Sequence, residues 1–413
     1  MTGDLPQSNS DASGRRLSRR HLLLGGAAAG VGAVSALAVE SGVRAATAPP
    51  PAPAYPTDDF GVVPFFGRHQ AGIATPAQAH AVFIALDLKP EVDAPALARM
   101  MRVLTDDAAR LTSGRPALAD TEPELAETPA RTTVTFGFGR GLVERVSAEA
   151  VPSWLRPLPA FKVDKLDEAW SGGDLLMQLA SNDAVALAHA RRMLLKDSRS
   201  FASVRWVQSG FRRSPGGEAT GTTMRNLFGQ LDGSANPAAD STEFDQVVWG
   251  GKNPAWLAGG TSFVLRRIAM NLDTWDLLDR SGRESSVGRT LDTGAPLTGS
   301  REHDEPDFAA TDTLGFPVIS TVSHLRRARS DDPTHRIFRR GYNYDEAPAG
   351  DGVSDSGLLF ASFQGDVDAQ FVPIQERLDA LDIMNTWTTP IGSAVFAIPP
   401  GCADGSYIGD TLF

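Results

Sequence analysis

The sequence predicts an α+β fold of two ferredoxin-like domains, each consisting of an antiparallel sheet and the helices that cover it. The main observation is the order of its patterned segments. In the first half, apolar strand-like runs and amphipathic runs follow the order strand, helix, strand, strand, helix, strand, which is that of a ferredoxin-like unit. The second half repeats this order loosely. We therefore expect an N-terminal domain at residues 61–228 and a C-terminal domain at residues 229–413.

The elements of the first domain are predicted from their periodicity. His80–Leu88 is an apolar run of strand length, and Ala94–Leu111 has apolar residues spaced by three and four, as in an amphipathic helix. Thr132–Phe138 alternates between apolar and polar residues, which is typical of a strand. A further strand, helix and strand follow at Asp174–Leu179, Asn182–Leu195 and Ser203–Phe211.

The second domain contains a long segment without sustained periodicity. This segment, Ser281–Asn343, is rich in Gly, Asp, Arg and Pro. Because an unstructured connection of such length is uncommon in a compact domain, we expect it to carry function or to wrap a ligand. The elements predicted around it are the strands Thr261–Asn271, Gly357–Gln364 and Ser393–Ile398, the short helix Leu272–Leu278 and the amphipathic segment Gln370–Met384.

Residues 1–45 are predicted to be a twin-arginine signal peptide. Ser18–Leu23 contains two adjacent arginines, and the apolar run after it is rich in alanine and interrupted by glycine. A membrane anchor is the alternative, but the run falls short of the roughly 20 strongly apolar residues that a stable span needs. Residues 46–60 are proline-rich and are predicted to be a linker. We expect folded export by the twin-arginine translocation machinery, to the periplasm or the cell exterior, with no stable membrane span after cleavage.

Charge and cysteine content exclude several function classes. The chain of 413 residues has a formal net charge of −11, which favours neither nucleic acid nor an anionic membrane surface as a partner. Cys402 is the only cysteine, so an intramolecular disulfide, a CxxC zinc site and covalent cofactor attachment through CxxCH are excluded. The sequence leaves open whether the chain forms a homo-oligomer.

Residues suited to catalysis occur in separate short segments. Asp232 lies in Gly229-Gln-Leu-Asp-Gly233, His324 in Val322-Ser-His-Leu-Arg326, and Arg339 in Ile337-Phe-Arg-Arg-Gly-Tyr342. Taken singly, none of these segments indicates a particular function. Asp-Gly is a turn signal, a lone histidine is more often a core or surface residue than a ligand, and paired arginines ordinarily form a solvated turn. Only their order along the chain indicates a function.

In this order, the segments resemble the motifs of the dye-decolourising peroxidases over nearly the whole predicted mature chain. GQLDG matches the family's GxxDG motif, VSHLRRA its histidine segment and IFRRGYNY its arginine segment. The leader and the RRGY segment are similar to those of a deferrochelatase-like subgroup. The segment RARSDDPTHR after the histidine departs from the family's Asn-Pro-Arg form. Further ordered matches are Val287–Arg289, Gly294–Leu297, Gly357–Gln364, Gln370–Gln375 and Gly392–Phe396.

The resemblance implies a non-covalent haem b and a role for each matching residue. His324 would ligate the haem iron, and an acid would hold its other ring nitrogen; Asp382 is the first candidate and Asp379 its rival. Asp232, on the opposite face, would accept a proton from hydrogen peroxide and return it, so an acidic optimum is expected. Arg339 would stabilise the charge that develops as the O–O bond breaks.

The same resemblance assigns further residues to the cofactor. Arg289 would pair with a haem propionate, and Gly233 belongs to the GxxDG turn. Leu359 and Phe363 would form an apolar wall beside the haem, although both are equally well explained as ordinary core residues.

Bulky dyes cannot enter a tight pocket, so we expect a relay to the organic reductant through aromatic residues near the surface. The candidates are Tyr342, Tyr344, Trp249 and Trp387. The histidines interpreted as structural or surface residues are His69, His80, His189, His303 and His335.

The sequence therefore predicts a haem peroxidase that uses hydrogen peroxide to oxidise bulky organic substrates such as dyes and phenolics. One alternative is a deferrochelatase or other haem-handling protein, which would use the same pocket to release iron from haem. A remote alternative is a non-catalytic ferredoxin-like binding module, in which Asp232, His324 and Arg339 would have no shared role.

Overall fold

The computed structural model describes residues 60–219, 221–348 and 352–413. The predicted signal peptide, and all of the predicted linker except Phe60, lie outside the described residues. Among those that are described, no helix combines the length and the apolarity that a membrane span requires.

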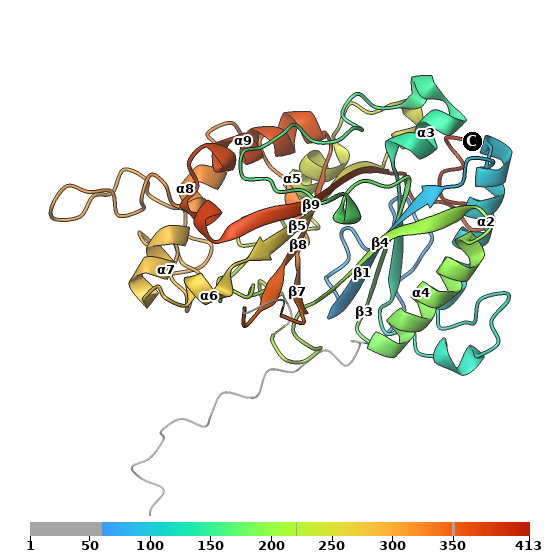
Figure 1. Ribbon diagram of the computed structural model, residues 1–413, viewed down its shortest axis with the longest axis horizontal. Helices are drawn as coiled ribbons and strands as arrows, with labels where there is room; N and C mark the ends of the chain where they lie inside the picture. The colour runs from blue at the N-terminus through green and yellow to red at the C-terminus, as the bar shows by residue number, and fades with distance from the viewer. Residues whose placement is uncertain (1–59, 220, 349–351) are drawn as a thin grey trace, which may run out of the picture. The chain divides into compact units, whose positions relative to one another are not determined.

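The N-terminal half forms an antiparallel sheet with the predicted element order. Its strands lie in the order β2-β3-β1-β4, and α2 and α4 cover the outer face (Figure 1). Side chains of Asp93 and Asp183 accept hydrogen bonds from the first turns of these helices, so each helix begins at a capping residue. The elements are β1 (His80–Leu88), α2 (Ala94–Thr112), β2 (Thr133–Phe138), α3 (Arg140–Val146), β3 (Leu175–Ser181), α4 (Ala184–Ser198) and β4 (Ala202–Phe211).

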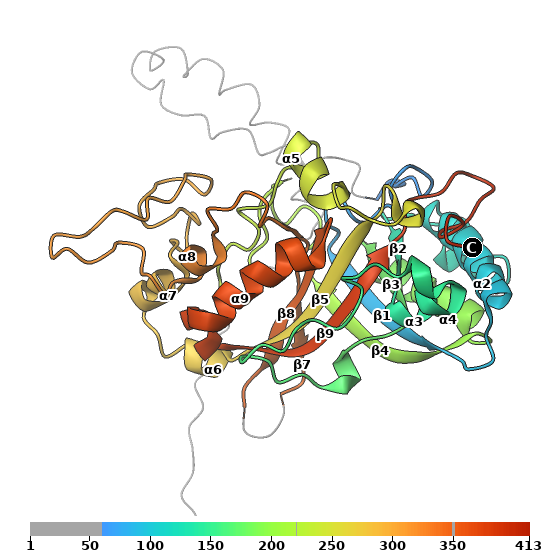
Figure 2. The same cartoon turned by 90° about the horizontal axis from the view of Figure 1, so that it is seen from above.

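The C-terminal half forms a second antiparallel sheet, in which β5 pairs with both β8 and β9, and β7 pairs with β8. Helix α9 crosses the outer face of this sheet, while α6, α7 and α8 gather at one end of it (Figure 2). The elements are α5 (Thr242–Phe244), β5 (Thr261–Met270), α6 (Leu272–Trp275), α7 (Arg280–Val287), α8 (His324–Ala328), β6 (Phe338–Arg339), β7 (Tyr342–Glu346), β8 (Asp355–Gln364), α9 (Val372–Leu381) and β9 (Thr388–Ile398). Short 3-10 or π turns occupy Pro123–Leu125, Ala148–Ala150, Glu168–Trp170, Asp245–Trp249, Ala255–Leu257, Val367–Phe371 and Ile383–Thr386.

The two sheets join at their edges and close into a barrel. Phe138 of β2 lies opposite Ala397 of β9, and Phe211 of β4 lies opposite Asn343 of β7. Together with the β5–β8 pairing, these contacts close the circle of strands, and β6 adds to β8. Aromatic side chains, among them Phe83, fill the interior of the barrel. The predicted α+β fold of two ferredoxin-like halves is confirmed, with the addition that strands of both halves share one sheet.

Two parts of the second half are more finely divided than the periodicity indicates. The segment Ser281–Asn343 contains α7, α8 and β6, each too short to show a sustained period. The amphipathic segment Gln370–Met384 is interrupted at Asp382, whose side chain accepts a hydrogen bond from the backbone N–H of Met384 and starts a new turn.

Two carboxyl groups, one buried and one partly buried, meet between α2 and α4. Asp107 on α2 is buried and accepts a hydrogen bond from the backbone N–H of Leu118, at 2.8 Å. Asp197, near the end of α4, has one carboxyl oxygen buried without a partner. Burial, and then the hydrogen bond and charge of Asp107, raise the pKa of Asp197 to about 7. The native state therefore holds this proton more tightly than the unfolded chain, in which an aspartate has a pKa of about 3.9.

We expect Asp197→Asn to stabilise the protein in alkaline solution. The raised pKa contributes stability that is fully present below about pH 4 and is lost as the pH rises through about 7. The amide keeps the neutral form at all pH values, so the free energy of unfolding at pH 8 should rise by about 1 kcal/mol, a figure reduced because the carboxyl is only partly buried. Denaturant unfolding at pH 4 and pH 8 measures this difference. Asp106→Asn, at an exposed carboxyl of α2 next to Asp107, is the control; an equal gain at both pH values in Asp197→Asn would contradict the prediction.

Candidate active site

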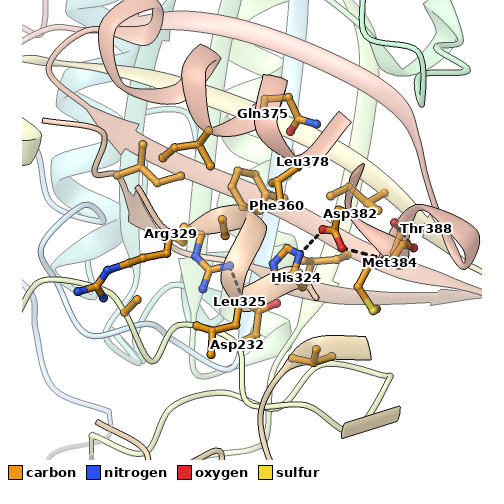
Figure 3. Close-up of a pocket in the computed structure, with 18 of the residues that line it drawn as sticks. Asp232, His324, Leu325, Arg329, Phe360, Gln375, Leu378, Asp382, Met384 and Thr388 are labelled. Carbon is orange, nitrogen blue, oxygen red and sulfur yellow. Dashed lines mark hydrogen bonds and ion pairs between the residues drawn. The ribbon is translucent and has the colours of Figure 1, made fainter. Parts of the chain in front are cut away.

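A cavity of about 600 Å³ lies beside α8 and α9 and the outer face of β5 and β8. This volume falls in the range of about 300–1,000 Å³ that is usual for cofactor and small-molecule sites. Much of the wall is apolar, with polar and charged groups at a limited number of positions. Leu325 of α8, Phe360 of β8 and Leu378 of α9 contribute to the apolar wall (Figure 3).

His324 and Asp382 meet at this cavity. Nδ1 of His324, the first residue of α8, lies 2.5 Å from Oδ2 of Asp382 (Figure 3). The other carboxyl oxygen of Asp382 accepts a hydrogen bond from the backbone N–H of Met384 at 2.9 Å, so both oxygens are fixed. The rival residue, Asp379, instead accepts a hydrogen bond from the backbone N–H of Val163, at 2.9 Å.

The surroundings of His324 favour the charged imidazole. Burial by itself lowers the pKa of His324, but the charge and the hydrogen bond of Asp382 outweigh burial and raise it above the usual value. Arg339 acts in the opposite direction, and Asp232 adds a smaller increase. A ring nitrogen can bind a metal only after it loses its proton. Because the Nδ1 proton is bonded to the carboxylate, Nε2 is the nitrogen that can lose its proton and act as a ligand.

Asp232 and Arg339 form an ion pair at the same cavity, with 3.0 Å between Oδ1 and a terminal guanidinium nitrogen. Asp232 lies on the loop before α5, and Arg339 lies on β6. The side-chain amide of Asn226 donates to the other oxygen of Asp232 at 3.4 Å, and Asn236 bonds the backbone of Arg339. Gly233 has a φ of 131°, which is open to glycine but strained for other residues, and it does not line the cavity.

Arg289 lines the cavity and is held by backbone carbonyl groups. Its guanidinium donates to the carbonyl oxygens of Gly294 and Glu302, each at 2.7 Å. Burial lowers the pKa of Arg289, and Glu302 partly offsets this effect. Gly294 has a φ of 70°, and a side chain there would collide with Leu231, so glycine lets the Arg289 loop pack against the GQLDG segment.

The prediction that Leu359 and Phe363 face the cofactor site is wrong. Both are fully buried in the interior of the barrel, and neither lines the cavity. Leu358 and Phe360 line it instead. Successive side chains of a strand point to opposite faces, so Leu359 and Phe363 lie on the face of β8 opposite to that of Leu358 and Phe360.

The relay candidates and the remaining histidines lie in varied surroundings. Tyr342 and Tyr344 are buried in the barrel and cannot meet a reductant at the surface, whereas Trp249 and Trp387 are partly exposed. His335, expected to be structural or on the surface, lines the cavity. The other described histidines lie elsewhere: His69 stacks on Trp249, His189 pairs with buried Asp120, and His80 and His303 do not line the cavity.

Sequence reasoning missed further residues that line the cavity. Among them are Gln230, Asn236, Arg266, Arg329, His335 and Arg336. Arg266 could have been found from the sequence, because it is a charged residue that interrupts the apolar run of its strand. It is buried and forms an ion pair with Asp164. No feature of the sequence pointed to Gln230, since it stands at a variable position of the GxxDG motif.

Gln230 shows that the cavity suits a bound group with hydrogen-bonding atoms. Its side chain is only 3% exposed, and neither its amide nitrogen nor its amide oxygen has a hydrogen-bond partner among the described residues. The hydroxyl of Ser234, also at the cavity, is buried without a partner. Buried polar atoms are normally satisfied, by water or a ligand where protein groups are lacking. With apolar walls, an available imidazole nitrogen and several arginines, the donor set fits a haem with its carboxylates.

Two sequence-family models match the chain. The model described as Dyp-type peroxidase, N-terminal, matches residues 70–212, and the one described as Dyp-type peroxidase, C-terminal, matches residues 223–403. The chain belongs to the dye-decolourising peroxidase family. This peroxidase is therefore a haem-dependent oxidoreductase, with hydrogen peroxide and a reductant as its substrates.

Relatives and solved structures agree with this membership. The Dye-decolorizing peroxidase of Thermobifida fusca is 39% identical over 358 residues, which are 83% of each chain. The Deferrochelatase of Escherichia coli (strain K12) is 35% identical over 370 residues, 84% of this peroxidase and 86% of the relative. The crystal structure of a DyP-type peroxidase from Cellulomonas bogoriensis is 54% identical, with a TM-score of 0.83, and the match covers 86% and 98% of the two chains. Ferric DtpA from Streptomyces lividans is 38% identical with a TM-score of 0.83, covering 87% and 99%.

We expect Asp382→Asn to weaken haem binding. The substitution removes the carboxylate that fixes the orientation and tautomer of the imidazole facing the cavity, and losses of this kind typically lower metal affinity about 10- to 100-fold. Titration of the haem-free protein with haem, followed by absorbance, measures the change. Asp379→Asn is a matched control, because that carboxylate bonds Val163 rather than His324. Equal weakening in both variants would show that the effect does not arise at the imidazole.

Proposed function

We propose that this protein uses hydrogen peroxide to oxidise bulky organic substrates such as dyes and phenolics, with His324 as the iron ligand and Asp232 and Arg339 as the peroxide-handling pair. The observation that carries the proposal is the convergence of these residues on one cavity. They come from α8, a loop and β6, and the cavity also has the buried, partnerless polar atoms of Gln230 that a bound group would satisfy. Haem, when bound, supplies the iron that binds the peroxide and receives its oxidising equivalents.

Asp232 and Arg339 divide the handling of peroxide between them. The carboxylate of Asp232 accepts the proton that one peroxide oxygen loses and returns it to the other oxygen, which leaves as water. The guanidinium of Arg339 stays charged throughout and stabilises the negative charge on the departing oxygen. His324 is held in one orientation by Asp382, so Nε2 points to a fixed position as a ligand.

Arg289 is proposed to hold a haem carboxylate. Among the described residues, the other arginines that line the cavity each have a carboxylate partner: Arg266 pairs with Asp164, Arg329 with Glu305, Arg336 with Glu243 and Arg339 with Asp232. Arg289 is bonded to backbone carbonyl groups and has no ion pair among these residues. A largely buried cation is costly unless paired, so a propionate is the natural partner for this guanidinium.

Removal of iron from haem is the second candidate function, because a relative that is 35% identical is named Deferrochelatase. That function would use the same haem cavity. The products separate the two functions. An oxidised organic substrate and intact haem support the peroxidase, whereas free iron and metal-free porphyrin support the alternative.

We expect Asp232→Asn to slow the reaction with hydrogen peroxide about 10²- to 10⁴-fold, the usual contribution of a proton-transfer residue. Arg339→Leu should slow it about 10²- to 10³-fold, which is the effect of losing a charge-stabilising donor. Stopped-flow absorbance of the haem-loaded protein gives both rate constants, and the same mixtures with a dye give the products. Arg140→Leu, at a surface ion pair with Glu144, is the control. Wild-type rates in both variants, or stoichiometric metal-free porphyrin in place of oxidised dye, would count against the proposal.

We also propose that the protein is exported folded by the twin-arginine route to the periplasm or the cell exterior, on the basis of Arg19, Arg20 and the apolar run that follows. The double substitution Arg19→Lys and Arg20→Lys should retain the full-length precursor inside the cell. Cell fractionation with immunodetection measures this, and unchanged export of the double variant would contradict the route.

A further inference from the structure

The side-chain amide of Asn236 makes a two-point contact with the backbone of Arg339. Its Nδ2 donates to the carbonyl oxygen of Arg339 at 2.7 Å, and its Oδ1 accepts from the backbone N–H of the same residue at 3.0 Å. A primary amide offers a donor and an acceptor side by side, so the contact resembles the pair of hydrogen bonds that a neighbouring strand would make.

Arg339 needs such a contact because its strand is short and lies at the edge of the sheet. β6 consists of Phe338 and Arg339, and among the described strands only β8 pairs with it. Asn236 therefore occupies the side of Arg339 that no strand covers. The backbone of Asn236 is itself held, because its N–H donates to the carbonyl of Gly233 at 2.8 Å.

The contact also links Arg339 to the loop that carries Asp232. The backbone of Asp232 is anchored to the carbonyl of Met224 at 2.8 Å, and its carboxylate pairs with the guanidinium of Arg339 at 3.0 Å. Arg339 is thus held by this loop at its side chain and at its backbone. If the backbone contact is lost, the long flexible side chain of Arg339 is restrained at its charged end alone, and the backbone of Arg339 keeps only its pairing with β8 and its buried neighbour Arg340 as supports.

We propose that Asn236 is a positioning residue for the peroxide reaction, which acts by fixing the backbone of Arg339 and thereby the guanidinium beside Asp232. This inference rests on the proposed role of Arg339. A misplacement of about 1 Å can slow an enzyme reaction on the order of 100-fold. Asn236 lines the same cavity as Asp232 and Arg339, and by fixing the backbone of Arg339 it can affect the rate without itself transferring a proton.

The test is a double-mutant cycle between Asn236→Ala and Arg339→Leu in the haem-loaded protein. The readouts are the dissociation constant of fluoride, titrated by absorbance on the ferric protein, and the rate constant with hydrogen peroxide. Fluoride is a small anion that accepts hydrogen bonds, so its affinity reports the position of a charged donor at the cavity without any turnover. Haem content and the thermal unfolding midpoint are measured for every variant. Asn253→Ala is the matched control, because that amide also donates to a backbone carbonyl, of Gly365 at 3.4 Å, but does not line the cavity.

We expect Asn236→Ala to weaken fluoride binding and to slow the peroxide reaction, each by about 10- to 100-fold, and to have nearly no further effect when Arg339 is already leucine. Asn236→Asp, which places an acceptor against the Arg339 carbonyl, should lose at least as much. If Asn236→Ala holds less haem than the wild type, the same measurements are made on Asn236→Ser, which retains one hydrogen-bonding group.

Each other outcome overturns the inference in a recognisable way. Equal losses with and without Arg339 would show that Asn236 acts by another route. Wild-type values in the Asn236 variants, together with a loss in Arg339→Leu, would refute the positioning role and leave the proposed function intact. Wild-type values in Arg339→Leu itself would refute the role of Arg339, and the inference would fall with it.

Discussion

The burial of both faces of the β5–β8 pair is the constraint on which the site depends. One face packs inside the barrel, where Phe263 and Phe363 are fully buried. The other face contributes Ile268 and Phe360 to the wall of the cavity, beside α8 and α9. Because side chains alternate along a strand, each strand divides its residues between a packed core and a binding surface. The barrel therefore supplies a rigid wall for the cavity without contributing its own interior to it.

The charged residues reach this wall from segments that are held in place by a few specific contacts. Asp382 serves both local structure and the site, because one carboxylate oxygen begins the turn after α9 and the other bonds His324. A further backbone contact joins the same regions, from the N–H of Ile383 to the carbonyl of Val322. The short helix that begins at His324 is thus tied to the C-terminal end of α9 at the histidine and just before it. Such support matters because a helix of so few residues has little stability of its own.

The sequence allowed the fold to be predicted, and it pointed to three residues that meet at the cavity, Asp232, His324 and Arg339, but it did not reveal the cavity itself. Strand and helix order follow from periodicity, and the segments of Asp232, His324 and Arg339 could be found from their order. Leu359 and Phe363 were misassigned because a strand buried on both faces reads as one apolar run, without the alternation that distinguishes its faces. Gln230 and His335 were missed because their position at the cavity depends on contacts between distant segments, which no local pattern encodes.

The ion pair of Asp232 and Arg339 is better explained by its proposed role in the peroxide reaction than by its contribution to the stability of the fold. Both side chains are partly exposed at the cavity, and such pairs typically contribute only about 0–1 kcal/mol to folding. Nevertheless, Asn226 bonds the carboxylate of Asp232, and Asn236 bonds the backbone of Arg339. The turn that follows Asp232 contains Gly233, which has a positive φ. These contacts order the two charges during folding, before any substrate arrives. In the proposed reaction, charges that are fixed in advance need no reorganisation as the O–O bond breaks, which is the condition under which electrostatic stabilisation of a transition state is strongest.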